Sequence, residues 1–336
     1  MKVAIVCDQL VERTPTHSIV ELVCNLYPTA TIYTVAHKKG KVLGPVEMHP
    51  IRSTFLSREV ESMADLRAKS FYIPRAIKSL PVPCSFEAVI CISSGIAHKF
   101  KTCANSKKLE ILVENSFKET TGGLLERFFK SSIIRFSEKN LDKNLVFSSH
   151  PAGIKGAELS PFVNTNDWFP GKENTQKTCV VVNPDGLTKK LLIQLKQFTE
   201  DSGLDFVLKF LPDGLSPSEF EHLEHPCSGE MLPVFHRSLC YVHGQKNIFP
   251  FSAIEANLSG VPVISLFSEL NSRVLFGGGT RFTNDFSDFK EALTDVSKMK
   301  ITKELDQLIR RKFSEKVFKA RLLRLLKERE INFSID

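Results

Sequence analysis

The sequence predicts an α/β protein with two doubly wound parallel-sheet domains and a long C-terminal helix. Three observations support this fold class. Short apolar, β-branched runs alternate with helical patterns along most of the chain. The chain has 336 residues, more than one ordinary core can organise. The alternation is interrupted by a polar, turn-rich stretch at residues 161–178, which we interpret as a linker between domains.

The first half of the chain begins with a strand–helix–strand unit. The predicted strands are Lys2–Cys7, Ala30–Val35, Ala88–Ser93, Leu109–Val113 and Leu145–Ser148. The predicted helices are Thr16–Leu26, Phe55–Lys78 with an interruption at Pro74, and Leu124–Phe136. Because continuous apolar runs are typical of parallel strands buried on both faces, we expect residues 1–160 to form the first domain.

The second half repeats the same alternation. The predicted strands are Cys179–Val182, Asp205–Leu211, Leu239–Val242 and Val261–Leu266. The predicted helices are Leu187–Glu200, Pro217–Leu223, Glu230–Phe235, Phe251–Leu258 and Asp285–Ser297. We expect residues 179–300 to form the second domain. Residues 301–336 contain one long helix, Thr302–Arg329, which we expect to pack across both domains.

Composition predicts an ordinary globular protein, with 42% hydrophobic and 25% charged residues. No apolar run approaches the length of a membrane-spanning helix. The apolar run at the N-terminus ends before Asp8 and is too short for the core of a signal peptide. The eight cysteines form no CxxC pair and no zinc-binding spacing. Four of them, Cys7, Cys91, Cys179 and Cys240, lie in or beside predicted strands, where cysteine packs as a small hydrophobic residue. We therefore expect reduced thiols, no metal site and a cytoplasmic location.

The positive charge is concentrated near the C-terminus. The chain carries a net charge of +7, and residues 298–330 contain twelve Lys or Arg against five acidic residues, a surplus of the same size. Such a helix is usually a solvated face whose apolar stripe packs on the protein. The alternative is a contact with nucleic acid or with anionic lipid, which would place the protein peripherally at the inner membrane face.

Several motifs occur in the order of a known family. The N-terminal ones are Asp8-Gln9-Leu10, Leu26-Tyr27-Pro28, Ile32-Tyr33-Thr34 and Thr54-Phe55-Leu56. The C-terminal ones are VNTNDWFP at 163–170 and FPFSAIEANLSGVP at 249–262. Together they resemble glycosyltransferase family 4, which has the GT-B fold of two Rossmann-like domains facing a central cleft. The resemblance covers nearly the whole chain, although the middle of the first half is shortened.

The resemblance implies transfer of a sugar from a nucleotide-diphosphate sugar to a glycan or lipid-linked acceptor, with retention and without an essential metal or a further cofactor. Glu255 matches the carboxylate that holds the donor ribose, and Asn247 occupies the position of a first glutamate eight residues earlier. We predict both as catalytic residues. The remaining predicted donor-binding residues are Lys189, Lys190, Asn183, Phe249 and Pro250. Lys189 matches a basic residue of the family that neutralises the pyrophosphate, and Lys190 lies beside it.

Polar residues near strand ends suggest an acceptor site in the first domain. Ligands of open α/β sheets bind at the carboxyl ends of the strands. Asp8 follows the first strand, and Ser93 and Ser94 close the strand at 88–93. We predict acceptor binding by these three residues and Thr14, with His17 as a catalytic residue nearby.

Each of these residues also has a structural interpretation. Glu255 could serve the dipole of its helix, and the two lysines could form a solvated first turn. Asp8, Ser93 and Ser94 could be caps, and His17 could be a hydrogen-bonded core residue.

Four departures from the family pattern keep other functions open. Thr14-Pro15 replaces a Gly-Gly pair, His17 an acidic residue, Pro184 an arginine and Asn247 a glutamate. One alternative is a non-catalytic GT-B relative that binds a nucleotide, glycan or protein partner. A lesser alternative is a DNA-base glycosyltransferase of viral type, which would have to flip its target base.

Overall fold

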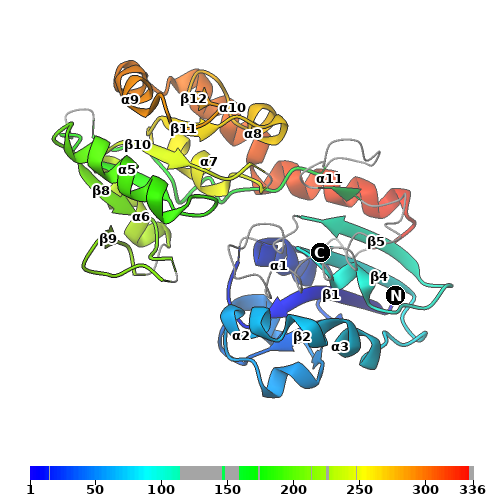
Figure 1. Ribbon diagram of the computed structural model, residues 1–336. Coiled ribbons are helices and arrows are strands. Elements are labelled where there is room, and N and C mark those ends of the chain that lie inside the picture. The colour runs from blue at the N-terminus through cyan, green and yellow to red at the C-terminus, as the bar shows by residue number, and fades with distance from the viewer. Residues whose placement is uncertain are drawn as a thin grey trace. The chain divides into compact units, whose positions relative to one another are not determined.

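Two parallel β-sheets organise the chain, and both are visible in the computed structural model (Figure 1). The structure describes residues 1–14, 16–113, 146–147 (backbone), 159–172, 175–212, 214–224, 227–246 and 248–332. The chain divides into two compact units, which are Met1–Pro161 together with Phe318–Asp336, and Phe162–Val317. We refer to them as unit 1 and unit 2. The predicted class, an α/β protein with two Rossmann-like parallel-sheet domains, is confirmed.

Unit 1 contains a parallel sheet with the strand order β3-β2-β1-β4-β5-β6. The strands are β1 (Val3–Leu10), β2 (Thr31–His37), β3 (Ile51–Ser53), β4 (Ala88–Ser93), β5 (Lys107–Leu112) and β6 (Val146–Phe147). The α-helices are α1 (Thr16–Leu26), α2 (Met63–Ala68) and α3 (Ile73–Ser79). Short 3-10 helices are η1 (Gly44–Met48), η2 (Phe55–Arg58), η3 (Ser70–Tyr72) and η4 (Ala97–Lys99). The predicted helix 124–136 lies outside the described residues.

The sheet of unit 1 is buried on both faces. All residues of β1 and β4 are buried. On one face Val6 and Val89 pack with Ile73 and Ile77 of α3. Helix α1 contacts β1 and β4 and buries Ile19, Val20 and Val23. This double covering explains why the strands consist of uninterrupted apolar residues.

Unit 2 contains a second parallel sheet, with the order β12-β11-β10-β7-β8-β9. The strands are β7 (Cys179–Asn183), β8 (Asp205–Leu208), β9 (Glu221–His222), β10 (Ser238–His243), β11 (Val263–Leu266) and β12 (Thr280–Thr283). The helices are α5 (Lys189–Glu200), α6 (Ser228–Arg237), α7 (Phe251–Leu258), α8 (Glu269–Val274), α9 (Phe289–Lys298), α10 (Lys303–Phe313) and α11 (Glu315–Glu328). Helix α11 belongs to unit 1 from Phe318 onward.

Different helices pack on the two faces of this sheet. Val181, Tyr241 and Val263 pack with side chains of α6, α7 and α10. The intervening residues, such as Val182 and Val242, pack with side chains of α5 and α9. Because successive side chains on a strand point to opposite faces, a residue two positions after Val181, Tyr241 or Val263 lies on the same face of the sheet, the one covered by α7.

The predicted helix Thr302–Arg329 is interrupted, so the prediction of one continuous helix is wrong. Ser314 is extended (φ −71°, ψ 148°) between α10 and α11. Its hydroxyl accepts a hydrogen bond from the Val317 backbone N–H at 3.4 Å, as an N-cap does. Phe313 is fully buried in unit 2, whereas Phe318 begins the second stretch of unit 1. In the described residues no helix is long and apolar enough to cross a membrane.

The predicted helix Pro217–Leu223 is also wrong. The segment forms turns and then the two-residue strand β9, which pairs with β8 at the sheet edge. Phe220 fixes it there, because its side chain is buried and lies 6.1 Å from the ring of Phe206. One buried aromatic residue in a short polar segment carries too little periodicity to separate strand from helix.

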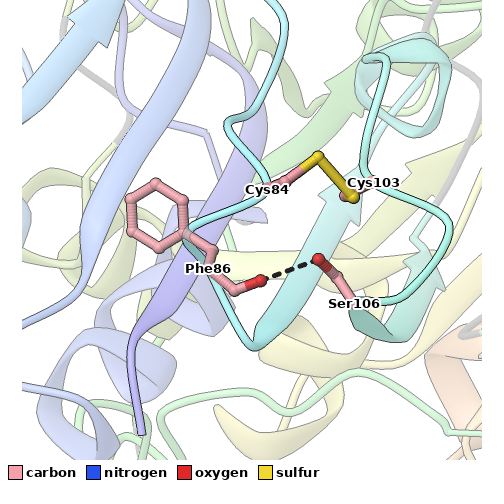
Figure 2. Close-up of a disulfide and its surroundings, with 4 residues drawn as sticks. All are labelled: Cys84, Phe86, Cys103 and Ser106. Carbon is pink, nitrogen blue, oxygen red and sulfur yellow. Dashed lines mark hydrogen bonds between the residues drawn. A yellow bond between two sulfur atoms is a disulfide. The ribbon is translucent and has the colours of Figure 1, made fainter.

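A disulfide joins Cys84 to Cys103, with a Cα–Cα distance of 5.0 Å. Figure 2 shows it between the loops that precede β4 and β5, next to the hydrogen bond of 2.7 Å from Ser106 Oγ to the Phe86 carbonyl. The prediction of reduced thiols is therefore wrong for this pair. Disulfides are rare in cytosolic proteins, so the cysteines no longer argue for a reducing compartment. Cys7, Cys91, Cys179 and Cys240 are free and buried, as predicted.

Reduction of the disulfide is expected to lower the free energy of unfolding by about 3 kcal/mol, because the unfolded chain regains the entropy of the closed loop. Urea unfolding of the protein with and without dithiothreitol, and of the C84S/C103S variant, measures this. Cys227→Ser, at an exposed free thiol, is the control. Identical midpoints for oxidised and reduced protein would contradict the expectation.

Candidate functional site

In unit 1 the carboxylate of Asp8 holds the loop that follows β4. Its Oδ1 accepts from the backbone N–H groups of Ile96 (2.7 Å) and Ala97 (2.6 Å). Its Oδ2 accepts from the hydroxyl of Ser94 at 3.0 Å and from the Ser94 N–H. Ser93 Oγ lies 3.5 Å from Oδ1 and 3.0 Å from Nδ1 of His98. Asp8 thus fixes the end of β4, and any acceptor contact by this group of residues depends on that loop.

His17 is buried at the start of α1 and hydrogen-bonded at both ring nitrogens. Nδ1 accepts from the Thr14 N–H at 2.8 Å, so the proton is on Nε2, which donates to the Gln9 carbonyl at 2.8 Å. Burial lowers the pKa of His17, which favours this neutral form. The ring has no free lone pair to accept a proton from a substrate, so we reassign His17 from catalysis to holding the loop before α1.

Four of these residues nevertheless lie together. Asp8, Thr14, His17 and Ser94 line one small hollow, together with Cys7, Gln9, Thr16 and Val20. The buried hydroxyl of Thr16 has no hydrogen-bond partner among the described residues. The sequence therefore identified residues that gather at one place at the carboxyl edge of the sheet.

In unit 2 a row of polar side chains crosses the carboxyl edge of the sheet. His243 of β10 is level with Asn183 of β7 on one side and with Ser265 of β11 on the other. Val182 is level with Leu208, so Lys209 continues the row beyond β8, and its N–H bonds to the Val182 carbonyl. Each of the four residues lies two positions after a residue that packs on the α7 face. All four side chains are therefore directed to the face covered by α7.

Helix α7 adds a hydroxyl and a carboxylate to this row. Ser252 lies in its first turn and accepts a hydrogen bond of 2.6 Å from Lys209 Nζ. Glu255 lies one turn later and is half-buried. Burial raises the pKa of Glu255, the Lys209 ammonium and the Ser252 hydroxyl oppose this rise, and Asp167 adds to it. Lys209 is thus the cation that favours the charged form of Glu255.

His243 lies at the centre of the row and is only 2% exposed. Neither ring nitrogen has a hydrogen-bond partner among the described residues. Burial lowers its pKa to about 3, and the positive charge of Lys209 contributes. His243 is therefore neutral near pH 7, with one donor and one acceptor still available.

Two glycine-containing loops pack against each other beside the row. Asn183 Nδ2 donates to Gln245 Oε1 at 3.2 Å. Gly186 has φ +79°, and a Cβ atom there would lie 3.0 Å from the Gly244 carbonyl oxygen. A Cβ at Gly244 would lie 2.3 Å from a methyl group of Leu187. Both positions require glycine because the backbones approach so closely.

The other predicted donor-binding residues lie in less favourable places. Lys189 begins α5 and forms an ion pair of 3.0 Å with Glu219, and Lys190 is exposed beside it. The side chain of Phe249 is 2% exposed and packs on Phe251 and Phe313, so it belongs to the core of unit 2. Pro250 is buried at the start of α7. Asn247 lies outside the described residues.

Comparison with solved structures identifies the fold. Anabaena HepE in complex with UDP-glucose superposes with a TM-score of 0.65 at 11% identity, over 98% of this chain and all of that one. Thermosynechococcus elongatus sucrose-phosphate synthase gives 0.69 at 9%, over 98% of both chains. A Rickettsia africae glycosyltransferase gives 0.57 at 12%, over 98% and 99%. The chain has the GT-B fold. Neither a family model nor a curated protein sequence matches it.

Three residues of the row and its helix were not predicted from the sequence, namely Lys209, His243 and Ser252. Lys209 was hidden because the strand was extended to Leu211, which placed the lysine inside it, whereas β8 ends at Leu208. His243 follows the predicted strand 239–242 directly, and that position alone could have identified it. Among the described residues no group of three His, Cys, Asp or Glu side chains is suited to hold a metal ion.

The neutral His243 makes stability depend on pH. The unfolded chain protonates this residue near pH 6.5 and the folded chain only near pH 3, so the unfolded state binds more protons in between. Its contribution to the free energy of unfolding is therefore lost as the pH falls below 6.5, by about 1.4 kcal/mol per pH unit. Urea unfolding of wild type and His243→Gln between pH 7 and 4.5 measures it. Parallel profiles of the two proteins would contradict this assignment.

Proposed function

We propose that the chain is a glycosyltransferase that uses a nucleotide-diphosphate sugar. The observation that carries this proposal is the polar row with Glu255 at the carboxyl edge of unit 2, the place where open α/β sheets bind ligands. The GT-B fold supports it, since one protein of this fold is known in complex with UDP-glucose. Glu255 would accept hydrogen bonds from the ribose hydroxyls, as a charged carboxylate can.

The proposed reaction exchanges one bond for another. The bond between the anomeric carbon and the distal phosphate oxygen breaks, and its electron pair remains on the nucleoside diphosphate. An acceptor hydroxyl oxygen bonds to the anomeric carbon, and its proton passes to the diphosphate or to solvent. We propose retention of configuration, no essential metal, and a glycan or lipid-linked acceptor held by unit 1 near Asp8 and Ser94. Positive charge near the leaving diphosphate is what this chemistry requires.

A second candidate is a non-catalytic relative that binds a nucleotide or a glycan. It is favoured by His17, whose ring nitrogens are both hydrogen-bonded, and by Lys189, which is paired with Glu219. This candidate predicts nucleotide binding without turnover. Incubation of the protein with UDP-glucose and GDP-mannose, followed by measurement of released nucleoside diphosphate, separates the two candidates.

Glu255→Gln is expected to reduce affinity for a nucleotide sugar on the order of 100-fold, because an amide replaces the charged acceptor of two hydroxyl hydrogen bonds. Isothermal titration calorimetry with UDP, GDP, ADP and their glucose or mannose conjugates measures the affinity. Glu291→Gln, on the exposed surface of α9, should bind like wild type. If wild type binds none of these compounds, the proposed function is wrong.

A further inference from the structure

Lys209 differs from Lys189, the lysine that the family pattern selects. Nζ of Lys189 is paired with Glu219 on the surface. Nζ of Lys209 donates to the Ser252 hydroxyl at 2.6 Å, and in the part of the chain that the structure describes no ion pair involves it. An ammonium group has three donors, and a single hydroxyl satisfies one of them. Lys209 therefore has unused donors and no paired counter-charge at the carboxyl edge of the sheet.

The surroundings of Lys209 are those of an anion site. Helix α7 has no side-chain cap and no acidic residue in its first turn, so no side chain neutralises the positive end of its dipole. The Phe251 and Ala253 N–H groups donate to the carbonyls of Phe249 and Pro250, so the dipole and the Ser252 side chain are what this helix start offers to an anion. His243 stands two strands away in the same row, buried and without a partner among the described residues. These are independent observations. A helix N-terminus, a lysine and a neutral donor gather where each would contact the same ligand.

We propose that Lys209, together with the N-terminus of α7, binds the diphosphate of the nucleotide, in the role that the family pattern gives to Lys189 and to the arginine replaced by Pro184. This inference rests on the proposed function and names the group that neutralises its leaving diphosphate. Ser252 holds the ammonium in place, and His243 donates one further hydrogen bond to the same ligand. Lysine suits this task because it contacts phosphate as a compact point charge.

The competing interpretation is that Lys209 only compensates the charge of Glu255 within the protein. The two interpretations differ in what removal of the ammonium does. If Lys209 is an internal counter-charge, Lys209→Met lowers the stability of the protein and lowers its affinity for nucleosides and nucleoside diphosphates equally. If it binds the ligand, the loss falls on compounds that carry the diphosphate.

The test is calorimetric titration of wild type, Lys209→Met, Lys209→Arg and Lys189→Met with UDP, GDP, ADP, the three nucleosides and inorganic pyrophosphate. We expect Lys209→Met to reduce the affinity for nucleoside diphosphates by roughly 10- to 100-fold and the affinity for nucleosides by less than about twofold. Lys209→Arg should retain part of the affinity. Lys298→Met, at the exposed end of α9, is the matched control. Ser252→Ala leaves the charge in place and should weaken the diphosphates by a smaller factor, even if Lys209→Met fails to fold.

Equal diphosphate affinity of wild type and Lys209→Met overturns the inference, as does a loss confined to Lys189→Met or a loss shared by the nucleosides. If no nucleotide binds but pyrophosphate binds in a manner that depends on Lys209, the anion site is supported and the proposed function fails. If neither nucleotides nor pyrophosphate bind to wild type, both proposals fail.

Discussion

The fixed register of the parallel sheet in unit 2 is the constraint on which the candidate site depends. Ladder hydrogen bonds hold β8, β7, β10 and β11 at set heights, so their ends place Lys209, Asn183, His243 and Ser265 in one row. A shift of one residue in any strand would turn its polar side chain to the face covered by α5 and α9. Because the strands are apolar on both faces, such a shift would also bury a polar group in a core.

The two units use charged groups at their sheet edges in opposite ways. In unit 1 the Asp8 carboxylate accepts hydrogen bonds from three backbone N–H groups and the Ser94 hydroxyl, so its charge stabilises a loop. In unit 2 the Lys209 ammonium donates to the Ser252 hydroxyl, and no ion pair in the described residues neutralises it. A saturated charge contributes to structure, whereas an unsaturated charge at a ligand-binding edge can contribute to binding. This difference separates a positioning residue from a candidate ligand residue.

Much of the fold could be predicted from the sequence, because α1, β4 and α7 have strong periodicity or clear boundary residues and match their predicted bounds. The break at Ser314 was missed because the apolar stripe continues on both sides of it, although serine before glutamate is a common helix start. The disulfide was missed because pairing depends on how close two loops lie, which spacing does not reveal. Among the candidate site residues, Glu255 was predicted from its motif. Lys209 belongs to no motif. Its position at the end of β8 could be predicted only from the exact strand boundary, and boundaries are the least reliable feature to predict from a sequence.

Glu255 and Lys209 have to be understood together. A charged carboxylate accepts hydrogen bonds from ribose hydroxyls more strongly than a neutral one, yet burial in the second turn of α7 raises the pKa of Glu255. The ammonium of Lys209 counteracts that rise, so the same cation that would neutralise a diphosphate also favours the ionised form of the carboxylate. The family pattern supplies positive charge from α5, where in this chain Glu219 pairs with Lys189. A lysine at the end of β8 instead places the positive charge on the face covered by α7. There Lys209 would bind the diphosphate and would also favour the charged form of the carboxylate that binds the ribose.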